Sequence, residues 1–156
     1  MKKRKVYLET TIFNYYFDKE RDAHKATKRL FEEIKRGKYE VYTSTYVIDE
    51  LLKADEPKKT KMLKLLEEYE VIILKYDEDS EKLADKYIEM NVIPKNYKYD
   101  GLHIAIASVN RLDYIISLNF KHINKLKTKL MTENINIQEG YKGIVICSPM
   151  EVVDDE

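Results

Sequence analysis

The stretch 99–108, YDGLHIAIAS, and the run 113–119 that follows it, DYIISLN, decide the fold of this 156-residue chain. At helical spacing, apolar side chains cover nearly every side of the first stretch, which predicts a helix that is buried all round. Small residues in it would let the helix lie close to a neighbour. Asp100 places a carboxylate at the start of this helix, and one interpretation of Asp100 is a simple N-cap residue.

Outward from this stretch, short apolar runs alternate with helical patterns. The predicted strands cover 6–8, 39–43, 71–74, 114–118 and 144–147, and the predicted helices cover 12–17, 24–35, 46–54, 59–69, 80–90 and 123–134. Such alternation requires crossover connections, so we expect an α/β, three-layer fold: a mostly parallel sheet of about five strands flanked by helices. The continuous apolar run 71–74 predicts a strand buried on both faces. In the last helix, Leu126 and Leu130 are expected to point inward.

Composition narrows the class of protein. The 28 basic and 28 acidic residues balance, so the chain has no global field that would attract nucleic acid. No apolar run is long enough to cross a bilayer, which predicts no membrane span. We expect a cytoplasmic protein with a single domain, 1–156. The one cysteine, Cys147, lies in an apolar run and is expected to be a buried thiol. With four glycines, the chain has no phosphate-binding glycine loop.

Polar side chains are expected to gather at one edge of the sheet. Glu9 and Asn119 each come just after a predicted strand, and Asp100 opens the helix that precedes the second of these strands. In parallel sheets, sites form outside the carboxyl ends of the strands. Glu50 projects on the inward flank of its helix, although a partly exposed flank residue is an equal interpretation.

Three carboxylates at one edge would repel each other and need either a cation or raised pKa values. Oxygen-rich clusters suit Mg²⁺ or Mn²⁺. The chemistry that needs such a site is phosphodiester hydrolysis, in which the metal activates a water and stabilises charge on the phosphate. No nucleophile elbow is present to suggest a serine hydrolase.

Four segments in this order resemble PIN-domain proteins, and among them the toxin ribonucleases of the VapC type: 6–11, VYLETT; 44–51, STYVIDEL; 100–107, DGLHIAIA; and 114–123, YIISLNFKHI. The resemblance covers nearly the whole chain. It implies a parallel sheet flanked by helices, a Mg²⁺ or Mn²⁺ site and cleavage of single-stranded RNA. It also implies a homodimer and an antitoxin protein whose basic side chain enters the acidic site.

By position, the resemblance assigns four catalytic residues: Glu9, Glu50, Asp100 and Asn119. The three carboxylates among them are the expected metal ligands. Thr10 and Ser117 are expected to support the site. The family usually has Asp at the position of Glu9 and often has Asp at the position of Asn119. Both changes lower the expected metal affinity, because Glu shifts the carboxylate and Asn lacks the charge. The alternative hypothesis is therefore a weakened or inert PIN-fold module that binds RNA or a partner protein.

Three further residues are candidates for RNA contacts. Lys98 lies in a stretch, 95–99, where basic and aromatic residues alternate beside Asp100, while Lys121 and His122 follow Asn119. Such residues can hold phosphates and stack on bases. The alternative for the stretch 95–99 is a solvated loop whose tyrosines pack against the protein. The alternative for Lys121 and His122 is that they are surface residues at the start of a helix. His103 is interpreted as a structural histidine with its hydrogen bonds satisfied.

Overall fold

The computed structural model describes residues 2–155, and in them five strands, eight α-helices and one short 3-10 helix. The elements in chain order are β1 Arg4–Leu8, α1 Thr10–Phe17, α2 His24–Lys35, β2 Tyr39–Ser44, α3 Thr45–Leu51, α4 Lys58–Glu68, β3 Ile72–Leu74, α5 Glu78–Glu89, the 3-10 helix Lys95–Tyr97, α6 Lys98–Val109, β4 Tyr114–Ile116, α7 Leu126–Gln138, β5 Val145–Cys147 and α8 Pro149–Val152. No helix within this range combines the length and the apolar character that a membrane span requires.

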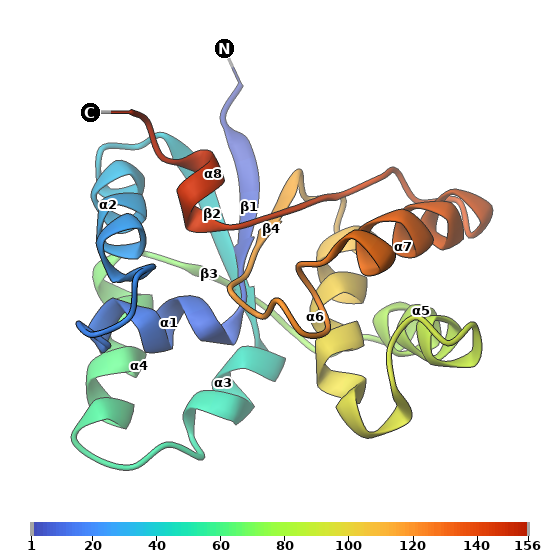
Figure 1. Cartoon of the computed structure of the whole chain (residues 1–156), viewed down its shortest axis with the longest axis horizontal. Helices are drawn as coiled ribbons and strands as arrows, with labels where there is room; N and C mark the ends of the chain where they lie inside the picture. The colour runs from blue at the N-terminus through green and yellow to red at the C-terminus, as the bar shows by residue number, and fades with distance from the viewer. Residues whose placement is uncertain (1, 156) are drawn as a thin grey trace.

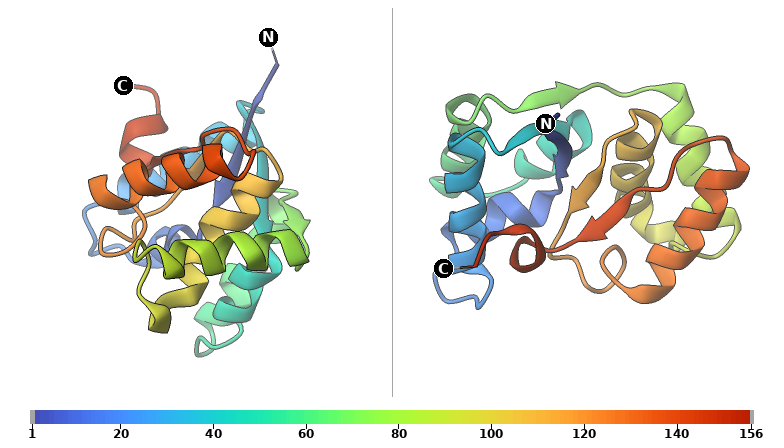
Figure 2. Two further views of the ribbon diagram at one scale, coloured as in Figure 1. Left: turned by 90° about the vertical axis from the view of Figure 1, so that its right-hand side faces the viewer. Right: turned by 90° about the horizontal axis from the view of Figure 1, so that it is seen from above.

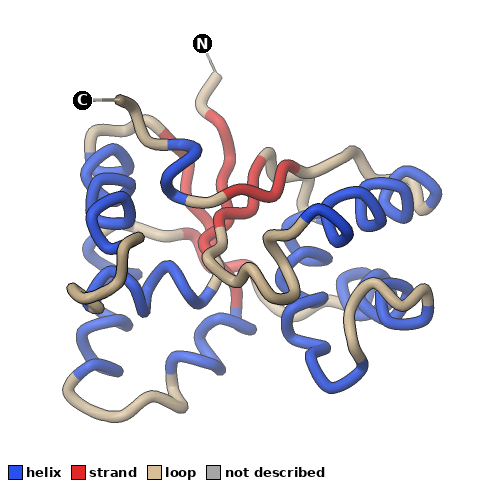
Figure 3. The backbone as a smooth tube through the Cα atoms, in the orientation of Figure 1, coloured by secondary structure: helices blue, strands red, loops and turns tan. Residues whose placement is uncertain are grey.

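The five strands form one parallel sheet in the order β3-β2-β1-β4-β5. Helices α1, α2 and α4 lie on one side of the sheet, and α5, α6 and α7 lie on the other (Figures 1 and 2). The tube in Figure 3 shows the strands enclosed between these two groups of helices. The predicted three-layer α/β architecture is therefore confirmed.

The core is built around the central strand and the helix that sequence periodicity singled out. Val6, Tyr7 and Leu8 of β1 are fully buried, and every residue of α6 from 101 to 108 is buried. A helix that is apolar on all sides can be stable only in such surroundings, so the prediction for this stretch is confirmed. The thiol of Cys147 is also buried, as expected.

Two predictions about apolar faces were wrong. The strand β3 lies at an edge of the sheet, and Ile72 is 44% exposed, so this strand is not buried on both faces. Leu126 and Leu130 on α7 are exposed. Apart from Ile135, the buried residues of α7 are polar, and they are tolerated because each finds a hydrogen-bond partner: Thr128, Thr132 and Asn136.

Several helix bounds differ from the predictions, and among them α1 begins at Thr10 instead of residue 12 and α7 spans Leu126–Gln138 instead of 123–134. Helix α6 begins at Lys98, so Asp100 lies in its first turn and makes no N-cap. Helix α5 begins at Glu78, and its cap is Asp77, whose side chain accepts a hydrogen bond from Ser80 N. In α6 the chain enters the helix from the 3-10 turn Lys95–Tyr97, which supplies an extra turn ahead of Asp100.

Candidate active site

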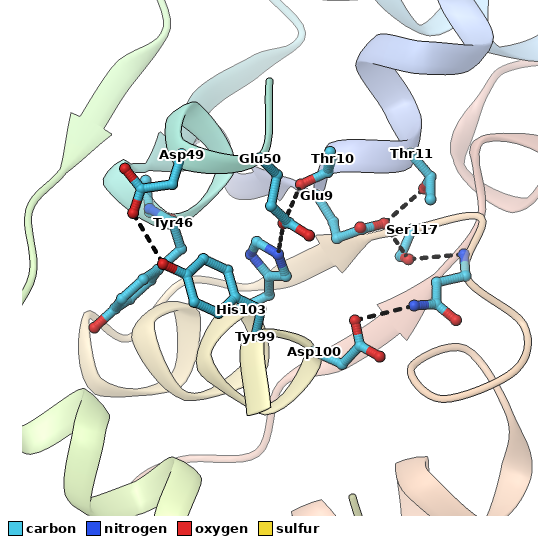
Figure 4. A network of polar contacts seen from close by, with 12 residues as sticks. Glu9, Thr10, Thr11, Tyr46, Asp49, Glu50, Tyr99, Asp100, His103 and Ser117 are labelled. Atoms are coloured by element: carbon cyan, nitrogen blue, oxygen red, sulfur yellow. Dashed lines mark hydrogen bonds and ion pairs between the residues drawn. The ribbon is translucent and has the colours of Figure 1, made fainter. Parts of the chain in front are cut away.

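The polar residues predicted to meet at the carboxyl ends of the strands do meet there. Glu9 follows β1 directly, and Ser117 and Asn119 follow β4. The amide of Glu9 donates a hydrogen bond to the carbonyl of Ile116 at 3.1 Å, which joins the ends of the two neighbouring strands. Figure 4 shows the side chains of Glu9, Glu50 and Asp100 turned toward a common space at this edge.

Glu9 is held by two hydroxyl groups. The hydroxyls of Thr11 and Ser117 each donate to Glu9 Oε1 at 2.6 Å, and the side chain is 3% exposed. Thr11 is itself fixed, because its Oγ1 accepts a hydrogen bond from the amide of Leu118. This arrangement orients one oxygen of a nearly buried carboxylate and ties the start of α1 to the end of β4.

Glu50 is the end of a buried chain of hydrogen bonds. Its Oε1 accepts from Thr10 Oγ1 at 2.6 Å and lies 2.6 Å from His103 Nε2. The other nitrogen of His103, Nδ1, is 2.7 Å from the hydroxyl of Tyr7, which in turn is 2.6 Å from Ser44 Oγ. His103 is therefore a structural histidine with both nitrogens partnered, as predicted, and it orients Glu50 from one side.

The pair Glu50–His103 favours the charged forms of both residues. Burial alone would raise the pKa of Glu50, but the hydrogen bond and the charge of His103 outweigh it and lower that pKa. Burial would likewise lower the pKa of His103, but Glu50, Glu9 and Asp100 raise it. The imidazolium thus offsets part of the negative charge that gathers at this edge.

Asp100 differs from the other two carboxylates. Burial raises its pKa to about 6; the charges of Glu9 and Glu50 raise it further, while the charge of His103 and the hydrogen bond from Asn119 oppose the rise. Its Oδ1 accepts a hydrogen bond of 3.2 Å from Asn119 Nδ2. Asn119 is therefore a donor to Asp100 in this arrangement, a role that an aspartate at the same position could not play when ionised.

The donor set has the chemistry of a magnesium or manganese site. In each of Glu9, Glu50 and Asp100, one carboxylate oxygen is held by protein groups, and no donor within residues 2–155 bonds to the other. These free oxygens are the hard ligands that such ions prefer. Within the described residues, no group of three or more acidic, histidine or cysteine side chains is placed so that it could hold a metal ion, so the three carboxylates do not form a complete metal cage. A magnesium ion that keeps several of its waters and takes one or two carboxylates does not need such a cage.

The candidate RNA contacts fall into two groups. Lys98 Nζ makes ion pairs with Glu81 at 2.9 Å and Asp85 at 3.1 Å, so it joins α6 to α5. His122 stacks on Tyr97, with ring centroids 4.1 Å apart, and Lys121 Nζ lies 5.7 Å from the centre of the Tyr97 ring. The second group lies next to Asn119, while Lys98 is already paired with carboxylates.

Sequence reasoning did not identify three members of this network: Thr11, Tyr7 and Ser44. The spacing of Thr11, two residues after Glu9, could have suggested a hydroxyl near the carboxylate. Tyr7 and Ser44 carry no such signal, because Tyr7 and His103 are 96 residues apart in the chain.

A hollow of about 740 Å³ lies away from this site, at the amino ends of β2 and β4. Tyr39 and Tyr114 are among the residues that line it.

Comparison with known proteins gives one family match. The family model of the PIN domain matches residues 6–142. A search of curated proteins found no significant match.

Similar solved structures include VapC20 of Mycobacterium tuberculosis, a toxin that cleaves the sarcin-ricin loop, with a TM-score of 0.59, 12% identity, and coverage of 89% of this chain and 98% of that one. A DNA-bound VapBC2 from Rickettsia felis matches with a TM-score of 0.55, 16% identity, and coverage of 92% and 98%. A DNA-bound VapBC from Salmonella typhimurium has a TM-score of 0.54, 15% identity, and coverage of 94% and 98%. At these identities the likeness concerns the fold.

Proposed function

The chain belongs to the PIN domain family, and from that premise we propose that it is a metal-dependent endoribonuclease that hydrolyses phosphodiester bonds of single-stranded RNA. The observation that carries the proposal is the meeting of Glu9, Glu50 and Asp100 at one sheet edge, each with one oxygen held by the protein and one oxygen free. Carboxylates arranged in this way repel each other unless a cation joins them.

One or two of the three carboxylates would hold Mg²⁺ or Mn²⁺ through their free oxygens, and waters would complete the shell of the ion. When bound, the ion would lower the pKa of a water and stabilise negative charge on the phosphate. The protein groups prepare the site: Ser117 orients Glu9, and Thr10 and His103 orient Glu50. Such preorganisation avoids the cost of ordering these side chains when substrate arrives.

Protonation sets the working range of the site. Because the pKa of Asp100 is about 6, this carboxylate is ionised and able to bind a cation above that pH in the free protein. Asn119 donates a hydrogen bond to Asp100 and so orients it. Asn119 has no basic group, so it does not remove a proton from water.

We also propose that the protein is the toxin of a toxin–antitoxin pair, which forms a homodimer and is inhibited by an antitoxin protein. The two VapBC structures to which the fold is similar support this part of the proposal. A basic side chain of the antitoxin would fit among the three carboxylates, where it would replace the cation electrostatically.

One observation favours the alternative, a PIN-fold module that binds RNA or a partner protein without cleavage. His103 already pairs with Glu50 at 2.6 Å, so part of the negative charge is neutralised before any metal binds. Glu9 and Asn119 reduce the expected affinity for a metal further. This module would bind RNA equally well with and without divalent cations.

The deciding experiment incubates a mixed single-stranded RNA with the protein in Mn²⁺, in Mg²⁺ and in EDTA. We expect cleavage only with a divalent cation, and we expect Asp100→Asn to reduce it at least about 100-fold, since the variant loses one of the charged groups that would bind the ion. Asp79→Asn, an exposed change in the first turn of α5, is the matched control and should cleave normally. Titration of Mn²⁺ by calorimetry gives a second readout, in which Asp100→Asn should bind more weakly. If the folded wild type does not cleave RNA and binds it with the same affinity with and without a divalent cation, the alternative is established.

A further inference from the structure

A second polar feature lies one loop away from the acidic site. A hollow of about 390 Å³ is lined by Lys95, Lys125, Lys127 and His122 over an apolar floor that includes Ile93 and Pro94. No acidic residue is among the described residues that line it. We call this feature the basic hollow. Its lysines are exposed, and within residues 2–155 no carboxylate forms an ion pair with any of them.

A buried nitrogen with no partner lies at the wall of the basic hollow. His122 is 8% exposed, and its Nε2 makes no hydrogen bond with any described residue. Burial of an unpaired polar nitrogen costs free energy, on the order of 1–3 kcal/mol, so such groups are uncommon unless a ligand completes them. The backbone of His122, by contrast, is hydrogen-bonded: its amide donates to Asn119 Oδ1 at 3.0 Å, and its carbonyl accepts from Thr128 Oγ1 at 2.8 Å.

The amino end of α7 also faces this region of the chain. The helix has 13 residues, its N-cap is Lys125, no side chain caps it, and no acidic residue lies in its first turn. The first amides of an uncapped helix carry partial positive charge and are ready to bind an anion. Lysines and a free helix end therefore favour a negatively charged group at the same place.

Hydrogen bonds of Asn119 connect the basic hollow to the acidic site. Asn119 Nδ2 bonds to Asp100, and Asn119 Oδ1 accepts from the amide of His122. In Figure 1 the segment after β4 passes beside α6 before it enters α7. Tyr97 packs against His122 and is 44% exposed, and Lys121 Nζ lies 5.7 Å from the centre of its ring, so an accessible aromatic side chain and a lysine lie beside His122.

We propose that the basic hollow binds a phosphate of the RNA strand whose scissile bond lies at the acidic site, with Lys125, Lys127 and His122 Nε2 as its ligands. The inference rests on the proposed function, and it names how the substrate strand runs: from the carboxylates, over Tyr97, into the basic hollow. Three features coincide there, namely lysines without ion pairs, an unpartnered buried imidazole nitrogen and an uncapped helix end.

The test measures binding of a fluorescein-labelled single-stranded RNA of about ten nucleotides in EDTA, where no cleavage interferes. We expect Lys125→Ala combined with Lys127→Ala to raise Kd about tenfold at low salt. We also expect it to reduce the slope of log K against log salt by about 0.7, since the one phosphate bound in the hollow contributes about that much on a single strand. Lys61→Ala combined with Lys64→Ala on α4, on the other side of the sheet, removes two exposed lysines as the matched control. Equal losses in the two double variants would mean that only overall charge matters, and would overturn the proposal.

His122→Phe tests the imidazole separately, because phenylalanine keeps a ring against Tyr97 but has no nitrogen. We expect Kd to rise several-fold, and an unchanged Kd would remove His122 from the site. The cleavage assay distinguishes the two proposals. Metal-dependent cleavage together with unchanged RNA binding in the lysine variant would leave the nuclease and overturn the basic hollow. No cleavage, together with lysine-dependent RNA binding, would leave the basic hollow and overturn the nuclease.

Discussion

At the scale of single residues, the acidic site combines two kinds of carboxylate. Glu50 is kept ionised by its imidazole partner, whereas burial and neighbouring charges raise the pKa of Asp100 to about 6. Environments that move two carboxyl groups in opposite directions are typical of functional sites. The consequence is that Asp100 is the group whose ionisation couples metal binding to pH.

The raised pKa of Asp100 predicts an effect on stability in the metal-free protein. Neutral Asp100 contributes stability that is fully present below its unfolded pKa of about 3.9 and is lost as pH rises through about 6. The amide of the variant Asp100→Asn stays neutral at every pH, so this variant should gain about 1 kcal/mol relative to the wild type between about pH 5 and about pH 7, after allowance for partial exposure. Urea unfolding in EDTA at both pH values measures this difference.

Asp113→Asn serves as the contrasting variant. Burial alone would raise the pKa of Asp113, but hydrogen bonds from the Lys5 amide and Lys142 Nζ lower it. Its stabilising effect is present above the unfolded pKa and is lost only as pH falls through the lower folded pKa. The cost of this substitution should therefore be constant from about pH 5 to about pH 7. A constant difference for Asp100→Asn as well would contradict the assignment of Asp100.

At the scale of elements, α6 determines where the acidic site can form. The helix packs closely against α5 and is buried from residue 101 to residue 108, while its first turn presents Asp100 to the site. Gly101 lies directly after that aspartate. A Cβ added there would lie 3.6 Å from Ile93 Cγ1 and 3.8 Å from Ala84 Cβ, both ordinary contacts. The close packing of α6 therefore does not depend on this glycine.

Gly101→Ala is expected to stabilise the protein by about 0.5–1 kcal/mol, because alanine in a helix interior loses less conformational freedom than glycine. The urea midpoint of the purified variant measures this. Gly140→Ala is the informative comparison, since Gly140 has a φ of +87° and nothing within 4 Å of an added Cβ, so backbone strain alone should destabilise that variant by about 1 kcal/mol. A loss of stability in Gly101→Ala would show that α5 and α6 approach more closely than the contacts indicate.

At the scale of the whole molecule, a buried polar link holds the three helices on one side of the sheet together. Asn136 on α7 is fully buried; it accepts a hydrogen bond from the Tyr87 hydroxyl on α5 and donates one of 2.9 Å to Ser108 Oγ on α6. Both the first turn of α6 and the amino end of α7 depend on how these helices are placed. The link therefore supports the acidic site and the basic hollow from a distance.

Asn136→Ala should destabilise the fold by about 2–4 kcal/mol, because the buried Tyr87 hydroxyl loses its acceptor, Ser108 Oγ keeps only its hydrogen bond to the carbonyl of Ile104, and a cavity opens. Asn134→Ala, two positions earlier on the exposed face of α7, should change stability by less than about 0.5 kcal/mol. Urea unfolding compares the two variants. Similar midpoints for both would show that the buried link adds nothing to stability.

Much of the fold could be predicted because local patterns report it directly. The helix 24–35 has the predicted bounds, and the run 99–108 is as buried as its apolar composition requires. Alternating strands and helices leave few topologies, and parallel strands bring the ends of β1 and β4 to one edge. The expectation that Glu9, Asp100 and Asn119 would be neighbours follows from that geometry, and the structure places them so.

The sequence by itself determined the class of fold, the buried helix and the sheet edge where carboxylates gather, because these follow from periodicity along the chain. Only the tertiary structure decided which faces are covered and which polar atoms meet: the edge position of β3, the polar inward face of α7, the pairing of His103 with Glu50, and the unpartnered nitrogen of His122. These features depend on side chains far apart in the chain, and hydrogen bonds between them leave no periodic trace in the sequence. Packing brings such groups together, and desolvation then determines their pKa values and whether they need a ligand.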